Sequence, residues 1–249
     1  MNPYIASAVA EMNKVPVSRF EHPGDSALDP ASCRFVAAFV RALGAKRILE
    51  FGSGFSTLMM AREIEAVEGN YLLSIDHLPA YSAAAREALE SSGCQAKVDF
   101  RVAKLKPRFY GPRLLLTYDL PKGLLDALGP FDLVLIDSPE HNYACEAVFY
   151  DAFPAVAEGG YLVLGEANRE GHEKVSSLNW DHAYGEDIQP AFLEGIGNGL
   201  NVVEKLADGR PQYQMAGALS VSLKTARAYG RLLLGRGLTP PPPGSSETE

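Results

Sequence analysis

The chain has 249 residues, 47% of them apolar, and this length suits one substantial core with at most small appendages. Its 23 basic and 31 acidic residues give a formal net charge of −8. This balance argues against a general nucleic-acid binder, because phosphate contacts need clustered Lys and Arg. The three cysteines are too few and too scattered for a disulfide framework or a zinc cluster, so reduced thiols are expected.

The two ends of the chain differ in composition from its middle. Residues 1–28 are predicted to be an N-terminal segment, a short helix followed by a loop, because Pro16, Pro23 and Gly24 interrupt any longer element. Residues 29–236 are predicted to form a single domain, and residues 237–249, which are rich in proline and polar residues, a disordered tail. The N-terminus lacks a basic start followed by an apolar core, and no apolar run approaches the ~20 residues of a membrane span. We therefore expect a cytoplasmic protein without membrane contact.

Between these ends, apolar strands alternate with amphipathic helices. Asp29 followed by Pro30 is typical of an N-cap and a first helical position, and that helix is expected to end at Gly44. The strands expected downstream are 47–51, 71–75, 98–102, 131–136 and 161–164, and the helices are 56–68, 79–91 and 145–156. This alternation predicts an α/β fold with a parallel sheet covered on both faces.

The last third is less regular. Residues 166–190 are predicted to be polar and irregular and residues 188–199 to be helical, while Val202-Val203 and residues 212–223 are predicted to be a closing pair of strands. A terminal helix is expected over residues 224–236. It carries Lys224, Arg227, Arg231 and Arg236, which are interpreted as a solvated or oligomer-contacting face rather than a membrane-bound one. The basic stretch 104–113, in which Phe109 and Tyr110 stand between the cations, is interpreted as a solvated loop; the alternative is contact with an anionic substrate or a nucleic-acid strand.

The first glycine turn supplies the clearest functional signal. Gly52 and Gly54 follow a strand and precede a helix, which lets backbone and helix N-terminal amides approach a ligand. A dinucleotide fingerprint would need a third glycine where Thr57 stands. Glu50, just before the turn, would repel a pyrophosphate but suit a ligand with positive charge. Asp76 ends the next strand, where a carboxylate can accept hydrogen bonds from ribose hydroxyls.

Four motifs carry a resemblance to a known family. ILEFGSGFST, LLSIDH, FDLVLIDSPEHNY and EGGYLVLGEAN resemble the ordered motifs of the class I S-adenosylmethionine-dependent methyltransferases, and the matches cover about residues 30–168. The resemblance implies a doubly wound, mostly parallel, Rossmann-like seven-stranded sheet with helices on both faces. It implies S-adenosylmethionine as the cofactor and a small-molecule methyl acceptor, with O-methylation favoured. The implied cofactor contacts are Glu50, Gly52, Ser53, Gly54, Ser56, Thr57, Asp76, His77 and Asp137.

Candidate catalytic groups follow the later strands. His141 titrates near neutrality and is predicted to be the general base, with Asp137 at the strand end before it. Asp137, Glu166 and Asn168 offer oxygen ligands for Mg²⁺, in partial resemblance to catechol-type O-methyltransferases. The alternative is that Asp137 orients substrate or cofactor while Glu166 is an ordinary solvated acid. If Mg²⁺ binds to these residues, the metal could activate the acceptor hydroxyl, and no histidine base would be required.

Other interpretations stay open from the sequence. The loop 169–187, with His172, Trp180, His182 and Tyr184, is either an aromatic lid over the substrate or a segment packed onto its own domain. An inactive cofactor-binding regulator or scaffold would retain the same glycine turn. An NAD(P)-dependent oxidoreductase is disfavoured by Glu50 and Thr57. The expected partners are a small-molecule acceptor and a second copy in a homodimer, with no nucleic acid and no membrane.

Overall fold

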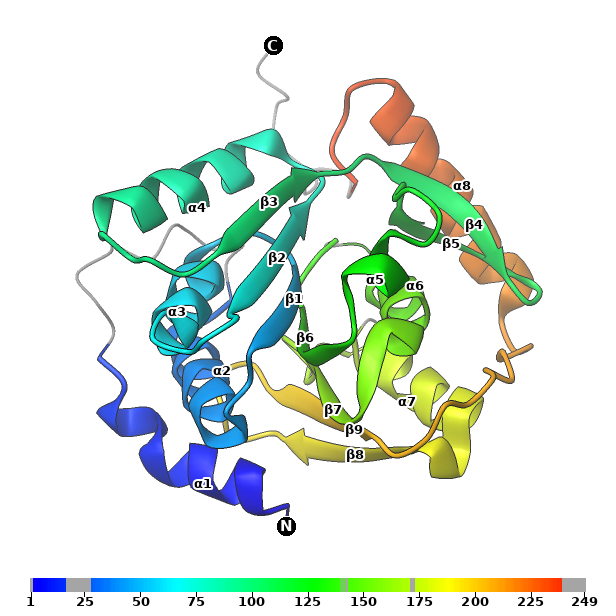
Figure 1. Ribbon diagram of the computed structural model, residues 1–249. Helices are drawn as coiled ribbons and strands as arrows, with labels where there is room; N and C mark the ends of the chain where they lie inside the picture. Colours follow the sequence, from blue (N-terminus) through cyan, green and yellow to red (C-terminus); the bar gives the residue numbers. More distant parts are fainter. Residues whose placement is uncertain (1, 17–27, 140, 142, 171–172, 239–249) are drawn as a thin grey trace.

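The computed structural model describes residues 2–16, 28–139, 141, 143–170 and 173–238. Its centre is a seven-stranded sheet with the strand order β3-β2-β1-β6-β7-β9-β8 (Figure 1). The strands are β1 (Arg47–Phe51), β2 (Tyr71–Asp76), β3 (Val98–Val102), β6 (Phe131–Ile136), β7 (Val156–Leu164), β8 (Ile188–Leu193) and β9 (Leu200–Lys205). The first five strands in this order are parallel, and β9 runs antiparallel to both β7 and β8. The predicted doubly wound α/β fold is confirmed.

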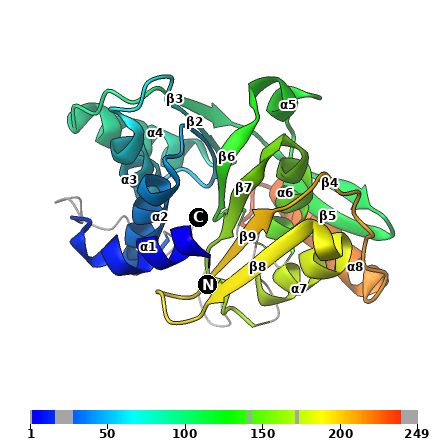
Figure 2. The same ribbon diagram turned by 60° about the horizontal axis from the view of Figure 1, so that its bottom comes forward.

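Helices cover both faces of the sheet (Figure 2). On one face lie α1 (Pro3–Glu11), α2 (Pro30–Leu43), α3 (Phe55–Ile64) and α4 (Pro79–Ser91), and on the other lie α5 (Leu124–Leu128), α6 (Ala144–Ala152) and α7 (Glu173–Tyr184). Each face has its own apolar core, because the buried residues of each strand alternate between the two sides. The last helix, α8 (Ala218–Leu233), packs against a separate hairpin rather than against the sheet.

Local signals explain the elements that were predicted well. The Asp29 carboxylate caps α2 by accepting hydrogen bonds from the Ala31 and Ser32 amides at 2.9 and 3.0 Å. Gly44 ends this helix in the left-handed conformation, at a φ of 61°. Helix α3 ends at Ile64, four residues earlier than predicted, and residues 65–69 form the turns that lead to β2.

Helix α6 is also shorter than predicted, and β7 is longer. The helix ends at Ala152, a short 3₁₀ turn follows over Phe153–Ala155, and β7 begins at Val156. Pro154 lies in that 3₁₀ turn, and a proline cannot donate the backbone hydrogen bond that a continuing helix needs. The predicted helix 145–156 therefore included residues that belong to the turn and the next strand.

The basic stretch 104–113 is not a solvated loop. It forms most of a β-hairpin, β4 (Leu105–Tyr110) and β5 (Arg113–Tyr118), which turns at Gly111 with a φ of 56°. Arg113 is buried and paired with Glu146 of α6. Lys106 pairs with Asp119 at 2.5 Å. The positive charges of this stretch are thus largely matched by carboxylates.

Three predictions for the last third are wrong. Residues 173–184 form α7 instead of an irregular segment, residues 188–193 form strand β8 instead of a helix, and α8 begins at Ala218, within the expected strand 212–223. Strand β9 pairs with β7 and β8 and not with residues 212–223. The prediction for 239–249 lies outside the described residues. None of the helices in the described part of the chain combines the length and apolar composition needed to cross a bilayer.

Candidate functional site

The glycine turn lies where β1, β2 and β6 end side by side. The Gly52 amide donates to the Ile75 carbonyl at 2.9 Å, and the Asp137 amide donates to the Phe51 carbonyl at the same distance. Gly52 has a φ of +110°, and a Cβ placed on it would lie 3.0 Å from Cβ of Ser138. The turn therefore needs glycine here both for its conformation and for the approach of the Asp137-Ser138 backbone.

Gly54 has a different environment although it belongs to the same turn. It is the N-cap residue of α3, and its amide donates to Thr57 Oγ1 at 2.9 Å. A Cβ placed on Gly54 would meet no atom within 4 Å. The space in front of Gly54 is thus open, and the N-terminal end of α3 faces it with the partial positive charge of a helix N-terminus.

Glu50 lies beneath the turn and is fully buried. Its Oε1 accepts a hydrogen bond from Ser56 Oγ, and its Oε2 accepts from Thr57 Oγ1 and from Ser74 Oγ at 2.7 Å. Burial raises the pKa of Glu50 to about 7, although the three hydroxyl donors oppose that shift. Glu50 has no exposed surface and both of its oxygens accept hydrogen bonds inside the protein, so it fixes the turn from below; its role as a cofactor contact remains a prediction.

Asp76 is joined to the same turn. Its Oδ2 accepts from the Ser53 amide at 2.9 Å, and its Oδ1 accepts from the Leu78 amide at 2.7 Å. Burial raises the pKa of Asp76, with the hydrogen bond from Leu78 opposing the shift. The His77 Nδ1 atom lies 3.5 Å from Asp76 Oδ1, and burial lowers the pKa of this imidazole. These contacts fix the direction of the Asp76 carboxylate at the end of β2.

Asp137 contrasts with Glu50. It follows β6 directly and is half-buried, and its carboxylate accepts no hydrogen bond from any residue that the structure describes. Burial raises its pKa well above the ordinary value, and the nearby charges of Glu166 and Glu50 raise it further. Asp137 is thus the carboxylate of this edge that retains its hydrogen-bonding capacity for a ligand.

Tyr118 forms part of the support for this edge and was missed by the sequence reasoning. Its hydroxyl donates to Ser138 Oγ at 3.0 Å, and its ring centroid lies 5.2 Å from that of Phe51 and 6.3 Å from that of His77. Tyr118 ends β5 of the unpredicted hairpin, so the sequence offered no signal for its place. Ser74, a polar residue inside the apolar strand β2, was the signal that could have revealed the hydroxyls around Glu50.

His141 lies three residues before the start of α6, near the end of β6 that Asp137 follows. Its side chain is buried, and its carbonyl accepts from the Ala144 amide at 2.7 Å. The ring of Tyr143 has two cations near its face, Arg113 at 5.3 Å and Lys224 at 5.8 Å from the ring centroid. The catalytic role of His141 remains a prediction.

The residues predicted to bind Mg²⁺ do not form a convincing cation site. Glu166 and Asn168 follow β7 beside Asp137, but Arg169 Nη1 lies 3.2 Å from Glu166 Oε2. The Asn168 amide donates to the Glu194 carbonyl at 3.0 Å, and its side chain is exposed in a hollow of about 530 Å³. A guanidinium already bound to Glu166 repels a divalent cation, so the donor set fits the metal poorly.

Comparison with known proteins agrees with this arrangement. The model of a family described as a methyltransferase domain matches residues 49–167. That match spans the glycine turn, the strand ends of β2 and β6, and the β4–β5 hairpin. A search of curated proteins found no significant match.

Solved methyltransferases share the fold at low sequence identity. A methyltransferase from Geobacter sulfurreducens has a TM-score of 0.56 and 17% identity, over 80% of this chain and 88% of that one. The O-methyltransferase TomG from Streptomyces achromogenes, in complex with S-adenosylmethionine, has a TM-score of 0.54 and 18% identity, over 83% and 91% of the two chains. An O-methyltransferase from Bacillus cereus, in complex with S-adenosylhomocysteine, has a TM-score of 0.53 and 17% identity, over 82% and 91%.

The described aromatic residues after β7 pack onto their own domain and do not form a lid. Trp180 is buried and stacks on Phe149, with ring centroids 4.1 Å apart and an interplanar angle of 15°. Tyr184 is buried against Phe153, with ring centroids 4.0 Å apart, and His182 is exposed. Trp180 and Tyr184 therefore pack α7 onto α6, which is the alternative to the lid; His172 lies outside the described residues.

Proposed function

We propose that this chain is an S-adenosylmethionine-dependent methyltransferase that acts on oxygen of a small molecule. The observation that carries the proposal is that three features lie at adjacent strand ends: a backbone at Gly54 with open space in front of it, a carboxylate at Asp76 oriented by two amides, and a carboxylate at Asp137 that accepts no hydrogen bond from a described residue. In an open α/β sheet, ligands bind beyond the carboxyl ends of the strands. The match of residues 49–167 to a methyltransferase domain supports the same reaction class.

The site residues fit such a cofactor group by group. Asp76 has both oxygens oriented by backbone amides, and each oxygen keeps capacity to accept from a ribose hydroxyl. The amides at the start of α3 suit the carboxylate of the methionine moiety. Asp137 suits the ammonium group of the methionine moiety. We assign to Asp137 the contact with positive charge that the sequence predicted for Glu50. The cofactor supplies an activated methyl group, so the protein's main task is alignment.

For an acceptor hydroxyl, the remaining task is removal of its proton. His141 is the residue we assign to this step, because it lies on the loop that follows Asp137. Two of the solved neighbours are named O-methyltransferases, which supports oxygen as the methylated atom. The poor fit of Glu166 to a cation leads us to assign no step to Mg²⁺.

The proposal also extends to the organisation and location of the protein. We assign residues 29–236 to one catalytic unit, because α8 packs on the hairpin that supports the site. The thiols of Cys33, Cys94 and Cys145 are all free, which supports a reducing compartment such as the cytoplasm.

Calorimetry on the full chain tests the cofactor assignment. S-adenosylmethionine and S-adenosylhomocysteine are expected to bind, and Asp76→Ala is expected to weaken both by ~10–100-fold, through loss of charge-assisted hydrogen bonds. Asp126→Ala, an exposed carboxylate on α5, is the matched control and should bind as the wild type does. Binding of a nicotinamide cofactor alone, or an unchanged dissociation constant in Asp76→Ala, would overturn the assignment.

A second experiment tests the reaction. Hydroxylated small molecules are screened for release of S-adenosylhomocysteine, and His141→Ala is then compared with the wild type on the best acceptor. The expected result is a fall in kcat of ~10²–10⁴-fold with the cofactor dissociation constant unchanged. If no acceptor is turned over although the cofactor binds, the regulator or scaffold alternative replaces the enzyme.

A further inference from the structure

Helix α8 has two apolar faces, and only one of them is covered. Val221, Thr225 and Ala228 are buried against the β4–β5 hairpin. Leu219 and Leu223 lie on another side of the helix, 76% and 50% exposed, and Leu233 at its end is 70% exposed. With about 100° of rotation per residue, these three leucines fall within an arc of about 80°. They form an exposed stripe, here called the leucine stripe.

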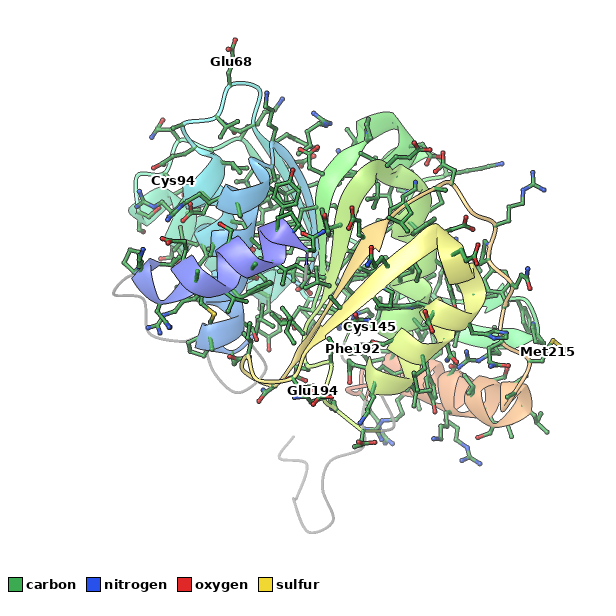
Figure 3. All side chains as sticks on the ribbon, turned by 90° about the horizontal axis from the view of Figure 1, so that it is seen from below. Glu68, Cys94, Cys145, Phe192, Glu194 and Met215 are labelled. Atoms are coloured by element: carbon green, nitrogen blue, oxygen red, sulfur yellow. The ribbon has the colours of Figure 1, made fainter. Side chains whose placement is uncertain are left out.

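The leucine stripe is continuous along the helix. Ala226 and Gly230 lie within the same arc, between Leu223 and Leu233, so no polar side chain interrupts it. Leu234, directly after the helix, is 72% exposed, and Met215, just before it, is 70% exposed. Figure 3 shows Met215 at the outer edge of the molecule, beside the start of α8. The helix thus presents an apolar strip along its whole length.

The charge around this helix is opposite to that of the whole protein. The chain carries −8, yet residues 209–238 contain no Asp or Glu and five basic residues: Arg210, Lys224, Arg227, Arg231 and Arg236. Three of these, Lys224, Arg227 and Arg231, occupy an arc of about 60° that lies next to the leucine stripe. Within the described part of the chain, no carboxylate pairs with Lys224 or Arg227. The segment therefore combines exposed leucines with two cations, Lys224 and Arg227, that no described carboxylate neutralises.

This combination decides between possible occupants. Two copies packed through their leucine stripes would bring two basic arcs together, and residues 209–238 supply no carboxylate to neutralise them. A bilayer surface with anionic headgroups neutralises the cations and receives the leucines at the boundary of its acyl chains. The stripe was not visible in the sequence prediction, because residues 212–223 were assigned to a strand and the helix was begun at Lys224.

We propose that α8 is a docking surface for anionic lipid bilayers, with the leucine stripe inserted at the interface and Lys224 and Arg227 facing the headgroups. The helix lies outside residues 49–167, which match the methyltransferase domain, so the proposal does not depend on the proposed reaction. It adds a surface contact to a protein for which no membrane partner was expected. The contact is peripheral and reversible, since one amphipathic helix provides it.

Co-sedimentation of the full chain with vesicles tests the proposal. The chain is expected to bind phosphatidylcholine vesicles that contain about 30% phosphatidylglycerol, and to bind pure phosphatidylcholine at least ~10-fold more weakly. The double variant Leu219→Ser/Leu223→Ser should lose at least ~10-fold in partitioning. The matched control is Leu178→Ser, which replaces a leucine that is 59% exposed on α7 and should bind normally.

The charge contribution has its own pair of variants. Lys224→Glu/Arg227→Glu should weaken binding to the anionic vesicles by at least ~25-fold, since each cation near such a surface contributes ~5-fold. Lys46→Glu/Lys122→Glu makes the same change of charge at exposed lysines elsewhere and should have a much smaller effect. Thermal unfolding and S-adenosylmethionine binding of each variant confirm that the fold is intact.

Three results would overturn the proposal. One is absence of binding to anionic vesicles, and another is equal binding of the wild type and Leu219→Ser/Leu223→Ser. The third is a dimer in light scattering that dissociates in the Leu219→Ser/Leu223→Ser variant, without vesicle binding by the wild type. That last result would assign the leucine stripe to a second copy of the chain.

Discussion

Replacing Glu50 by Gln tests whether a buried carboxylate beneath the glycine turn titrates near neutral pH. Burial moves the pKa of Glu50 from its ordinary value of 4.5 to about 7 in the folded protein. Because the folded pKa is the higher one, the stability from this group is fully present below about pH 4.5 and is lost as pH rises through about 7. A shift of this size corresponds to about 3 kcal/mol at most. Gln has no proton to lose and keeps partners for Ser56, Thr57 and Ser74.

The assay is urea unfolding of wild type and Glu50→Gln at about pH 5 and about pH 8. Between these values the wild type should lose about 2.5 kcal/mol more of unfolding free energy than the variant. Other buried acids titrate in both proteins, so the difference between the two isolates Glu50. Glu158→Gln, at an exposed position, should follow the wild type. Parallel pH profiles for wild type and Glu50→Gln would refute the argument from burial.

Three further outcomes are expected. Gly52→Ala should lower the unfolding free energy by about 1–3 kcal/mol, because Gly52 has a positive φ and the added Cβ would lie 3.0 Å from Ser138 Cβ. Gly54→Ala should unfold like the wild type. It should bind S-adenosylmethionine more weakly in calorimetry, since its Cβ would enter the open space in front of the turn. Trp180→Ala should cost about 3–5 kcal/mol in urea unfolding, and a loss below about 1 kcal/mol would contradict its packing on α6. Methyl transfer should be insensitive to EDTA, because Arg169 already pairs with Glu166; activity that needs added Mg²⁺ would restore the metal site.

The first half of the fold could be predicted because its signals are local. The Asp29 cap and the Gly44 terminator each act within one turn of their own helix. The central strands are buried on both faces and are therefore mostly apolar, as in β6 (Phe131–Ile136), where Asp132 is the one polar residue. Neither signal depends on residues far along the chain.

The later elements depend on partners distant in sequence, which explains why they were mispredicted. The sequence of α7 is polar, yet Asn179 in this helix is buried because its side-chain amide donates to Glu146 Oε2 at 2.8 Å. Arg113, in the stretch interpreted as a solvated loop, is buried because it pairs with the same Glu146, 33 residues away. A polar side chain looks solvent-facing in the sequence until its buried partner is known.

The same reasoning explains why the sequence identified the acids of the candidate site better than their roles. Glu50 and Asp137 both end neighbouring central strands, and both have raised pKa values because of burial. They differ in their partners: three hydroxyls donate to Glu50, whereas no described residue donates to the Asp137 carboxylate. Two of those hydroxyls lie six and seven residues further along, in α3, and the third lies on β2. A motif can therefore place a carboxylate at the site, but the hydroxyls that the fold brings to it decide whether its charge faces the turn or the ligand.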